Sequence, residues 1–363
     1  MLNKIKVAIV YDRVNKFGGA ERVLLALHEM FPDAPLYTSV YKKEKAKWAE
    51  VFPKIYTSYL QNIPILRNYH EIIGWLMPLA FESFEFKDYD MVISVTSEAA
   101  KGIITGTKTY HVCYCLTPTR YLWSGYNEYF SSHILKFVTK PIVNYLRWWD
   151  KVAGQRPDKI IAISTEVQKR IEKYYGRKSE IIFPPVNKFQ ELKSYKQVIK
   201  NYYLYVGRLV KYKKVGLLVD TFNELGLPLV IVGSGSEESK LKLKAKKNIK
   251  FLGNIKDEEL IGVYSKSKAF LMPQDEDFGI TAVEAQSFGV PVIAFKSGGA
   301  LDTVINNKTG IFFNEQTVTS LKEAIAKFDT MRFNDGYLRN NAKRFDKVIF
   351  KKRLNSLIKN NNI

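Results

Sequence analysis

The sequence has few of the residues that build disulfide frameworks or zinc centres. It contains two cysteines, Cys113 and Cys115, and four histidines among 363 residues. The two cysteines are two positions apart in an apolar run, so on a strand they would point the same way and be badly placed to pair. We therefore expect two buried thiols in a reducing compartment, and no zinc or other metal site.

Long hydrophobic runs and targeting signals are also missing. No apolar run reaches the roughly 18–20 residues that a membrane-spanning helix needs. The first residues, MLNKIKVAIVY, lead straight into an expected strand and carry no signal-peptide pattern. These features predict a cytoplasmic protein that, at most, lies on the inner face of a membrane as a peripheral protein.

The sequence has fewer acidic than basic residues. The chain has 56 Lys+Arg against 36 Asp+Glu, a formal net charge of +20. Such an excess predicts anionic partners, namely nucleic acid, a phosphate-bearing ligand or an anionic membrane surface. Because the basic residues are spread along the chain and no RNA-binding module is recognisable, a non-enzymatic nucleic-acid binder is disfavoured. We expect no nucleic-acid partner.

The stretch from Leu271 to Val292 carries the most informative pattern. It is typical of a strand, a loop, a helix and a further strand, with Glu276 in the loop and Glu284 about one turn into the helix. A helix start exposes unpaired N–H groups and can receive an anion. Glu276 could then reach sugar hydroxyls on one side of a bound phosphate, and Glu284 a ribose on the other. The alternative is that both acids merely complement the helix dipole.

A second motif follows the expected strand Tyr202–Val206. Gly207 and Arg208 come directly after this strand, and Lys213 lies at the start of the next expected helix. Ligands of open α/β sheets bind beyond the carboxyl ends of the strands. A helix start repels cations, so Lys213 requires an anionic partner. Lys211 and Lys214 are more simply explained as surface lysines.

The first expected strand leads into a glycine loop. Gly18 and Gly19 precede a helix that contains Glu21, which alone is a weak indication of phosphate binding. The segment has no G-x-G-x-x-G pattern, and this disfavours a dinucleotide-dependent oxidoreductase.

These motifs together resemble a known family. The run E-D-F-G-I-T-A-V-E, followed by G-V-P-V-I-A, is similar to the E-x7-E signature of glycosyltransferase family 4. The resemblance implies an α/β GT-B fold, with two Rossmann-like domains facing across a cleft, and a retaining enzyme that uses nucleotide sugars without a metal or other cofactor. It makes Glu276, Arg208 and Lys213 the candidate catalytic residues. It implies donor contacts from Gly18, Gly19, Glu21, Gly207, Asn254, Phe278, Gly279, Ile280, Thr281 and Glu284.

The loop after Tyr110–Cys115 resembles a mannosyltransferase-like branch of that family. This chain has Leu116 where the branch is expected to have a histidine, so Thr117 and Arg120 are the candidates for sugar or phosphate contacts in the first domain. The nearby His111 is expected to be structural. The branch favours mannose from GDP-mannose, while a UDP-linked glucose or galactose donor, or an epimerase or phosphorylase of the same fold, stays open.

The proline pair Pro184-Pro185, followed by polar residues 187–200, predicts a domain boundary. With this boundary, the resemblance implies an acceptor-side domain at 1–185, a nucleotide-sugar domain at 186–344, and a C-terminal helix at about 345–363 that packs back on the first domain.

Two stretches bear on the acceptor. Residues 59–86 are rich in aromatic residues and predict either a buried helical hairpin or a surface at a lipid interface. Residues 131–152 predict a long helix with apolar and basic residues, which either packs on its own sheet or lies on anionic lipid. From charge and context we expect a glycan or polyprenyl-diphosphate-linked acceptor at an anionic membrane surface, in the synthesis of surface polysaccharide or glycoprotein precursors.

Overall fold

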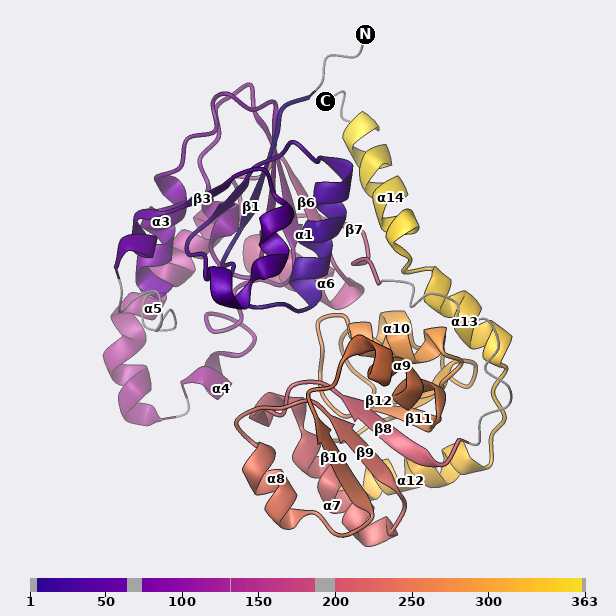
Figure 1. Cartoon of the computed structure of the whole chain (residues 1–363). Helices are drawn as coiled ribbons and strands as arrows, with labels where there is room; N and C mark the ends of the chain where they lie inside the picture. Colours follow the sequence, from indigo (N-terminus) through magenta and orange to yellow (C-terminus); the bar gives the residue numbers. More distant parts are fainter. Residues whose placement is uncertain (1–4, 64–73, 131, 187–199, 361–363) are drawn as a thin grey trace. The chain divides into compact units, whose positions relative to one another are not determined.

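The computed structural model describes residues 5–63, 74–130, 132–186 and 200–360. The chain divides into an N-terminal unit, residues 1–185 with 348–363, and a C-terminal unit, residues 186–347. Each unit is a parallel sheet with helices on its faces (Figure 1). The predicted α/β class with two Rossmann-like domains is confirmed. The predicted linker falls largely on residues 187–199, outside the described residues.

The N-terminal unit is built on a seven-stranded sheet of order β3-β2-β1-β4-β5-β6-β7, in which every recorded pair is parallel. All residues of β1 and β4 are buried, as expected for strands covered on both faces. The strands are β1 (Val7–Tyr11), β2 (Leu36–Thr38), β3 (Ile55–Thr57), β4 (Met91–Thr96), β5 (Tyr110–Cys115), β6 (Lys159–Ala162) and β7 (Glu180–Ile181).

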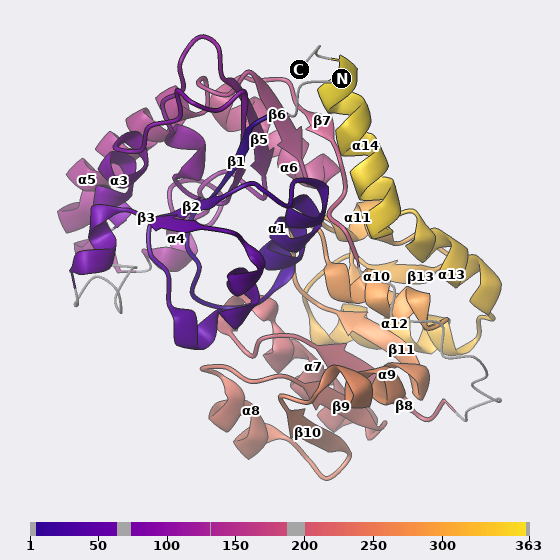
Figure 2. The ribbon, with the colours of Figure 1, turned by 45° about the horizontal axis from the view of Figure 1, so that its top comes forward.

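The helices of this unit include one from the C-terminus. In α14, Phe350 packs against Tyr114 of β5, and Lys351 forms an ion pair with Glu29 of α1. Both views show α14 beside β7 and α1 (Figures 1 and 2). The helices are α1 (Gly19–Met30), α3 (Met77–Glu82), α4 (Tyr126–Tyr129), α5 (His133–Ala153), α6 (Thr165–Tyr175) and α14 (Lys347–Asn360), with 3-10 turns η1 (Lys43–Lys45), η2 (Lys47–Val51), η3 (Tyr59–Asn62), η4 (Gly74–Leu76) and η5 (Ala100–Gly102).

The segment that follows β4, residues 97–102, forms no α-helix. It contains only the 3-10 turn η5, because the carboxylate of Asp12 accepts hydrogen bonds from the N–H groups of residues 97–100 at 2.7–3.0 Å. The segment therefore wraps around Asp12 instead of continuing as an α-helix.

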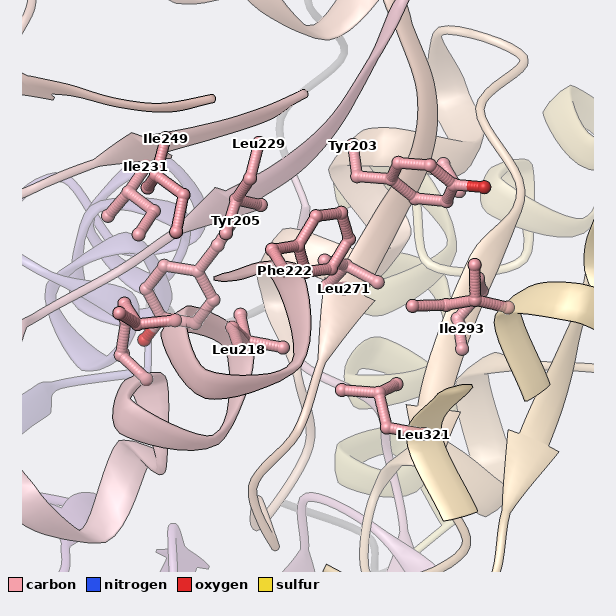
Figure 3. Close-up of a cluster of buried hydrophobic side chains, with 14 of the residues drawn as sticks. Tyr203, Tyr205, Leu218, Phe222, Leu229, Ile231, Ile249, Leu271, Ile293 and Leu321 are labelled. Carbon is pink, nitrogen blue, oxygen red and sulfur yellow. The ribbon is translucent and has the colours of Figure 1, made fainter. Parts of the chain in front are cut away.

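The C-terminal unit has a six-stranded parallel sheet of order β10-β9-β8-β11-β12-β13. On one face, Tyr203 and Tyr205 pack with Leu218 and Phe222 in the hydrophobic core (Figure 3). The strands are β8 (Tyr202–Val206), β9 (Leu229–Val232), β10 (Ile249–Gly253), β11 (Ser267–Met272), β12 (Val292–Phe295) and β13 (Gly310–Phe313).

Helix α8 (Glu238–Lys244) ends where Asn223 accepts from the N–H of Lys246 and donates to the carbonyl of Lys244. The helices are η6 (Lys211–Lys213), α7 (Val215–Leu225), α8 (Glu238–Lys244), α9 (Asp257–Ser265), α10 (Ile280–Ser287), α11 (Ala300–Thr303), α12 (Val318–Asp329) and α13 (Asp335–Lys343).

The strand order reverses once in each sheet, between β1 and β4 and between β8 and β11. Ligands of such sheets bind outside the carboxyl ends of the strands at these reversals. The segments brought together there are 12–21 with 97–101, and 207–213 with 273–279.

Other expectations concern cysteines, metals and membranes. Cys113 and Cys115 are both buried and unpaired in a disulfide, as predicted. Among the described residues, no group of three or more metal-ligating side chains occurs. Within the same ranges, every helix is too short or too polar to cross a bilayer.

Candidate functional site

An ion pair spans the strand-order reversal of the C-terminal unit. Lys213, in the 3-10 turn after β8, is paired with Glu276, in the loop after β11. Their side chains are 15% and 17% exposed, so the pair lies at the surface of the edge and within reach of a ligand. Gln274 donates a further hydrogen bond to Glu276 at 2.9 Å. The anionic partner that the sequence required for Lys213 is therefore the predicted catalytic carboxylate itself.

Arg208 lies exposed beside this pair. Its guanidinium donates to the hydroxyl of Tyr212 at 2.5 Å, and the ammonium of Lys213 lies 5.2 Å from the centre of the Tyr212 ring. Tyr212 thus contacts both candidate cations and helps to fix their positions. Tyr212 and Gln274 were not predicted from the sequence; their only signal was proximity in the chain to Arg208 and Glu276.

Glycines let neighbouring loops approach one another at this edge. Gly233, after β9, has φ +121°, and a Cβ there would collide with the carbonyl of Gly207. Gly207 in turn donates to Val232 at 3.0 Å, and Asn254, after β10, donates to Ser234 at 2.9 Å. The predicted donor residues Gly207 and Asn254 therefore lie at one sheet edge, on either side of the loop after β9 that both of them contact.

The start of α10 is the predicted anion site. Gly279 precedes the helix with φ +89°, a conformation that favours glycine, and Ile280 and Thr281 form the first turn, half-buried. The N–H of Gly299 donates to the carbonyl of Glu276 at 2.7 Å, which fixes the loop before the helix. Phe278 is buried with its ring 5.4 Å from that of Phe345, so only its backbone is available to a ligand.

Glu284 is less accessible than its predicted contact with a ribose suggests. Its residue is 2% exposed, and one carboxylate oxygen accepts the hydroxyl of Tyr264 at 3.0 Å. Tyr264 is itself fixed by stacking on Phe288 at 5.4 Å. An ionised carboxylate has about four acceptor positions, so the bond from Tyr264 orients Glu284 without using all of its capacity.

In the N-terminal unit, the predicted glycine loop encloses a buried acid. Glu21 is 1% exposed and accepts the hydroxyl of Tyr11 at 2.8 Å. Burial, with the Glu21 carboxylate adding to it, raises the pKa of Tyr11 well above its ordinary value. A Cβ at Gly18 would lie 3.3 Å from Glu21, so Gly18, Gly19 and Glu21 form one tight start to α1.

Three charged residues at the reversal of this sheet were missed from the sequence. Asp12, which is 3% exposed, fixes the backbone of residues 97–100, and Arg13 forms an ion pair with Glu98. Burial raises the pKa of Glu98, against the opposing effect of Arg13. An aspartate immediately after the first strand was the signal that could have found this cluster.

The loop that departs from the family pattern is held by a buried ion pair. Lys101 and Asp150 lie 2.6 Å apart and are at most 2% exposed, and Asp150 also accepts from Thr119 at 2.8 Å. Thr117 is 4% exposed and accepts from Arg170 at 3.4 Å, whereas Leu116 and Arg120 are half-buried. The functions of Thr117 and Arg120, like those of Gly18, Gly19 and Glu21, remain predictions.

Comparison with known proteins bears on the fold of the chain and on its C-terminal unit. Residues 187–345 match the family of glycosyl transferases group 1. An uncharacterised glycosyltransferase of Methanocaldococcus jannaschii is 28% identical over 206 residues, which are 55% of this chain and 58% of the relative. A GDP-mannose-dependent monoacylated α-(1-6)-phosphatidylinositol monomannoside mannosyltransferase of Corynebacterium glutamicum is 39% identical over 108 residues, 27% of this chain and 28% of the relative. The chain thus spans under two thirds of these curated relatives.

A solved structure agrees over nearly the whole length. Anabaena HepE in complex with UDP-glucose superimposes with a TM-score of 0.69 at 19% identity, covering 98% of this chain and all of that one. The chain therefore has the GT-B fold, as predicted, and the match to group 1 glycosyl transferases lies in its C-terminal half.

Proposed function

We propose that this protein is a retaining glycosyltransferase. It moves a hexose from a nucleoside diphosphate sugar to a glycan or lipid-linked acceptor, in the synthesis of surface polysaccharide or glycoprotein precursors. The observation that carries the proposal is the Lys213–Glu276 pair at the strand-order reversal, beside Arg208. The group 1 domain over the same residues supports it.

The pair suggests how the donor is received. Before binding, Glu276 neutralises Lys213; a bound diphosphate competes for Lys213 and Arg208 and releases Glu276 to accept hydroxyl groups of the sugar. The start of α10, residues 278–281, offers N–H groups to the same phosphate. Glu284, oriented by Tyr264, accepts from the ribose.

The chemical step follows from where charge develops. The bond between the sugar C1 and the β-phosphate oxygen breaks, and negative charge grows on the phosphate, where Arg208 and Lys213 stabilise it. The acceptor oxygen attacks C1 on the same face, and its proton passes to the departing phosphate, so the anomeric configuration is retained. These two cations stabilise the phosphate charge that a metal ion would otherwise stabilise. We therefore expect turnover to need no metal ion.

The donor sugar is a narrower proposal. Mannose from GDP-mannose is favoured by the similarity to a GDP-mannose-dependent relative. The likeness to HepE keeps UDP-glucose as the alternative.

A transfer assay with Glu276→Gln tests the proposal. The variant keeps the shape of the side chain but loses the charge, so turnover should fall on the order of 10- to 100-fold, equal to one charge-assisted contact of about 1.5–3 kcal/mol. Because Lys213 is freed, the nucleoside diphosphate should bind at least as tightly as to the wild type. Glu258→Gln, at an exposed carboxylate on α9, is the matched control.

The product is examined by NMR for its anomeric configuration, with and without a chelator. Inverted product, dependence on a divalent metal, or full activity of Glu276→Gln would each contradict the corresponding part of the proposal.

A further inference from the structure

Helix α5 exposes a row of large apolar side chains in the N-terminal unit. Phe137 is 81% exposed and Trp148 is 62% exposed, on a helix of 21 residues. Among its described side chains, those of residues 133–142 are all exposed or half-exposed. The apolar residues that are more than a third exposed are Ile134, Phe137, Val138, Ile142, Tyr145, Trp148 and Val152.

These residues form one continuous face. At about 100° per residue they occupy roughly 140° of the helix circumference, and they extend over about 27 Å of its length. Of the residues that α5 buries, Val143, Leu146 and Asp150 lie on a different arc, whereas Trp149 is buried within the arc of the exposed face. The helix therefore has one apolar face turned to its own unit and another turned to solvent.

The exposed apolar area of the outward face is larger than is usual for a monomeric soluble protein. Taking about 200 Å² for a full aromatic side chain, Phe137, Tyr145 and Trp148 alone expose on the order of 400 Å². The aliphatic residues between them take the face beyond the roughly 300–600 Å² of the largest patch on a typical monomer. Such a surface indicates a docking site.

The neighbouring helix α3 extends this surface. Trp149 of α5 donates to Glu82 of α3 at 2.7 Å, and both views show the two helices side by side (Figures 1 and 2). In this neighbouring segment, Trp75 in η4 is 49% exposed and Leu79 in α3 is 53% exposed.

The charges around the face have one sign. Lys140 and Lys151 are exposed on α5, whose single carboxylate, Asp150, is buried against Lys101. At the C-terminal end of the face, Lys151 and Lys173 line a pocket of about 420 Å³ together with Val152, Gln155, Tyr174, Tyr175 and Gly176. No acidic side chain is among these described lining residues.

We propose that this face of α5, continued by Trp75 and Leu79, rests in the boundary between headgroups and acyl chains of an anionic phospholipid bilayer. Helices in that position bury their apolar face about 5–10 Å deep, and tryptophan and tyrosine favour that depth. The pocket with Lys151 and Lys173 then lies at the level of the lipid phosphates. This surface would bring the enzyme to a lipid-linked acceptor. Only this biological purpose rests on the proposed function; the contact with the bilayer does not.

A second copy of the chain fits this face less well. In a symmetric dimer through α5, each copy would bring the same cations and no exposed carboxylate of α5 to pair with them. The net charge of +20 adds to the repulsion. An anionic bilayer supplies the missing opposite charge.

Flotation of the full chain with lipid vesicles tests the proposal. Phosphatidylcholine vesicles are used with and without phosphatidylglycerol, at low and at high salt. The wild type should float with the anionic vesicles and be released by salt. Phe137→Ser with Trp148→Ser should reduce binding at least tenfold, and Lys140→Gln with Lys151→Gln about 25-fold, at about fivefold per charge.

The matched control is Leu243→Ser, at a side chain that is 90% exposed on α8 of the other unit; it should float like the wild type. All variants should keep the thermal unfolding temperature, because the replaced side chains are exposed. Donor binding is measured separately, so failure of the glycosyltransferase proposal would leave the flotation result intact. The proposal is overturned if the wild type does not float, if Phe137→Ser with Trp148→Ser floats equally well, or if that variant instead abolishes a dimer.

Discussion

Replacing Asp150 by Asn should strongly destabilise the N-terminal unit. The carboxylate accepts from Lys101 at 2.6 Å, Thr119 at 2.8 Å, Trp123 at 2.7 Å and Tyr175 at 2.9 Å, all in a site that is 1% exposed. Asn keeps the volume, so no cavity forms. It removes the charge that compensates buried Lys101 and turns an N–H₂ group towards at least one donor.

The expected loss is about 3–5 kcal/mol, the cost of breaking one buried ion pair from one side. Lys101→Met should cost less, because Asp150 keeps three donors. The double variant should be less destabilised than the sum of the single variants, since neither charge is then left alone.

Tryptophan fluorescence during urea unfolding measures this unit by itself. All five tryptophans, at positions 48, 75, 123, 148 and 149, belong to residues 1–185. A loss below about 1 kcal/mol for Asp150→Asn, or strictly additive variants, would refute the reasoning.

Three further predictions concern the pH dependence of stability, the orientation of Glu284 and the backbone at Gly233. Burial, with Arg156 adding to it, lowers the pKa of His111 from 6.5 to about 3. His111 therefore binds a proton below pH 6.5 in the unfolded chain, but only below about pH 3 in the folded protein. The free energy of unfolding falls as the pH drops through that window, by about 2 kcal/mol between pH 7 and 5. His111→Asn should lose this slope in the fluorescence assay, and an unchanged slope would assign it to other groups. Tyr264→Phe should raise the KM for the donor about tenfold with kcat little changed, because Glu284 loses its orienting bond of about 1.5 kcal/mol or more; steady-state kinetics giving a fall in kcat alone would contradict this. Gly233→Ala should weaken nucleotide binding measured by calorimetry at least tenfold, because its Cβ would displace the loop of Gly207; wild-type affinity would show that this loop does not shape the site.

The strands and the chemistry of the site were predictable because both are local in sequence. Apolar runs such as Val7–Tyr11 predict strands buried on both faces, and Arg208 and Glu276 each lie in the loop that follows such a strand. Which residues meet was not predictable. The pairing of Lys213 with Glu276 depends on β8 and β11 being neighbours, and the bonds of Asp12 to residues 97–100 depend on β1 lying next to β4.

Helix α5 shows a second limit of sequence analysis. Its periodicity predicts apolar faces, but Val143 and Leu146 face the unit while Phe137 and Trp148 face solvent. Composition does not distinguish these faces, because the same residue types occupy both. The packing of residues 122–130 against one side of the helix decides between them.

The central claim is that Arg208 and Lys213 receive the diphosphate of a sugar nucleotide. Isothermal titration calorimetry with GDP, UDP, ADP and NAD tests it on the wild type, on Arg208→Ala with Lys213→Ala, and on the control Lys211→Ala, which removes an exposed lysine of the same turn. We predict that one nucleoside diphosphate binds and that NAD does not. The double variant should weaken binding by a factor of about 10²–10⁴, from the loss of two contacts of about 1.5–3 kcal/mol each, and the control should leave binding unchanged. Binding of NAD alone, or nucleoside diphosphate binding that survives the double variant, would contradict it.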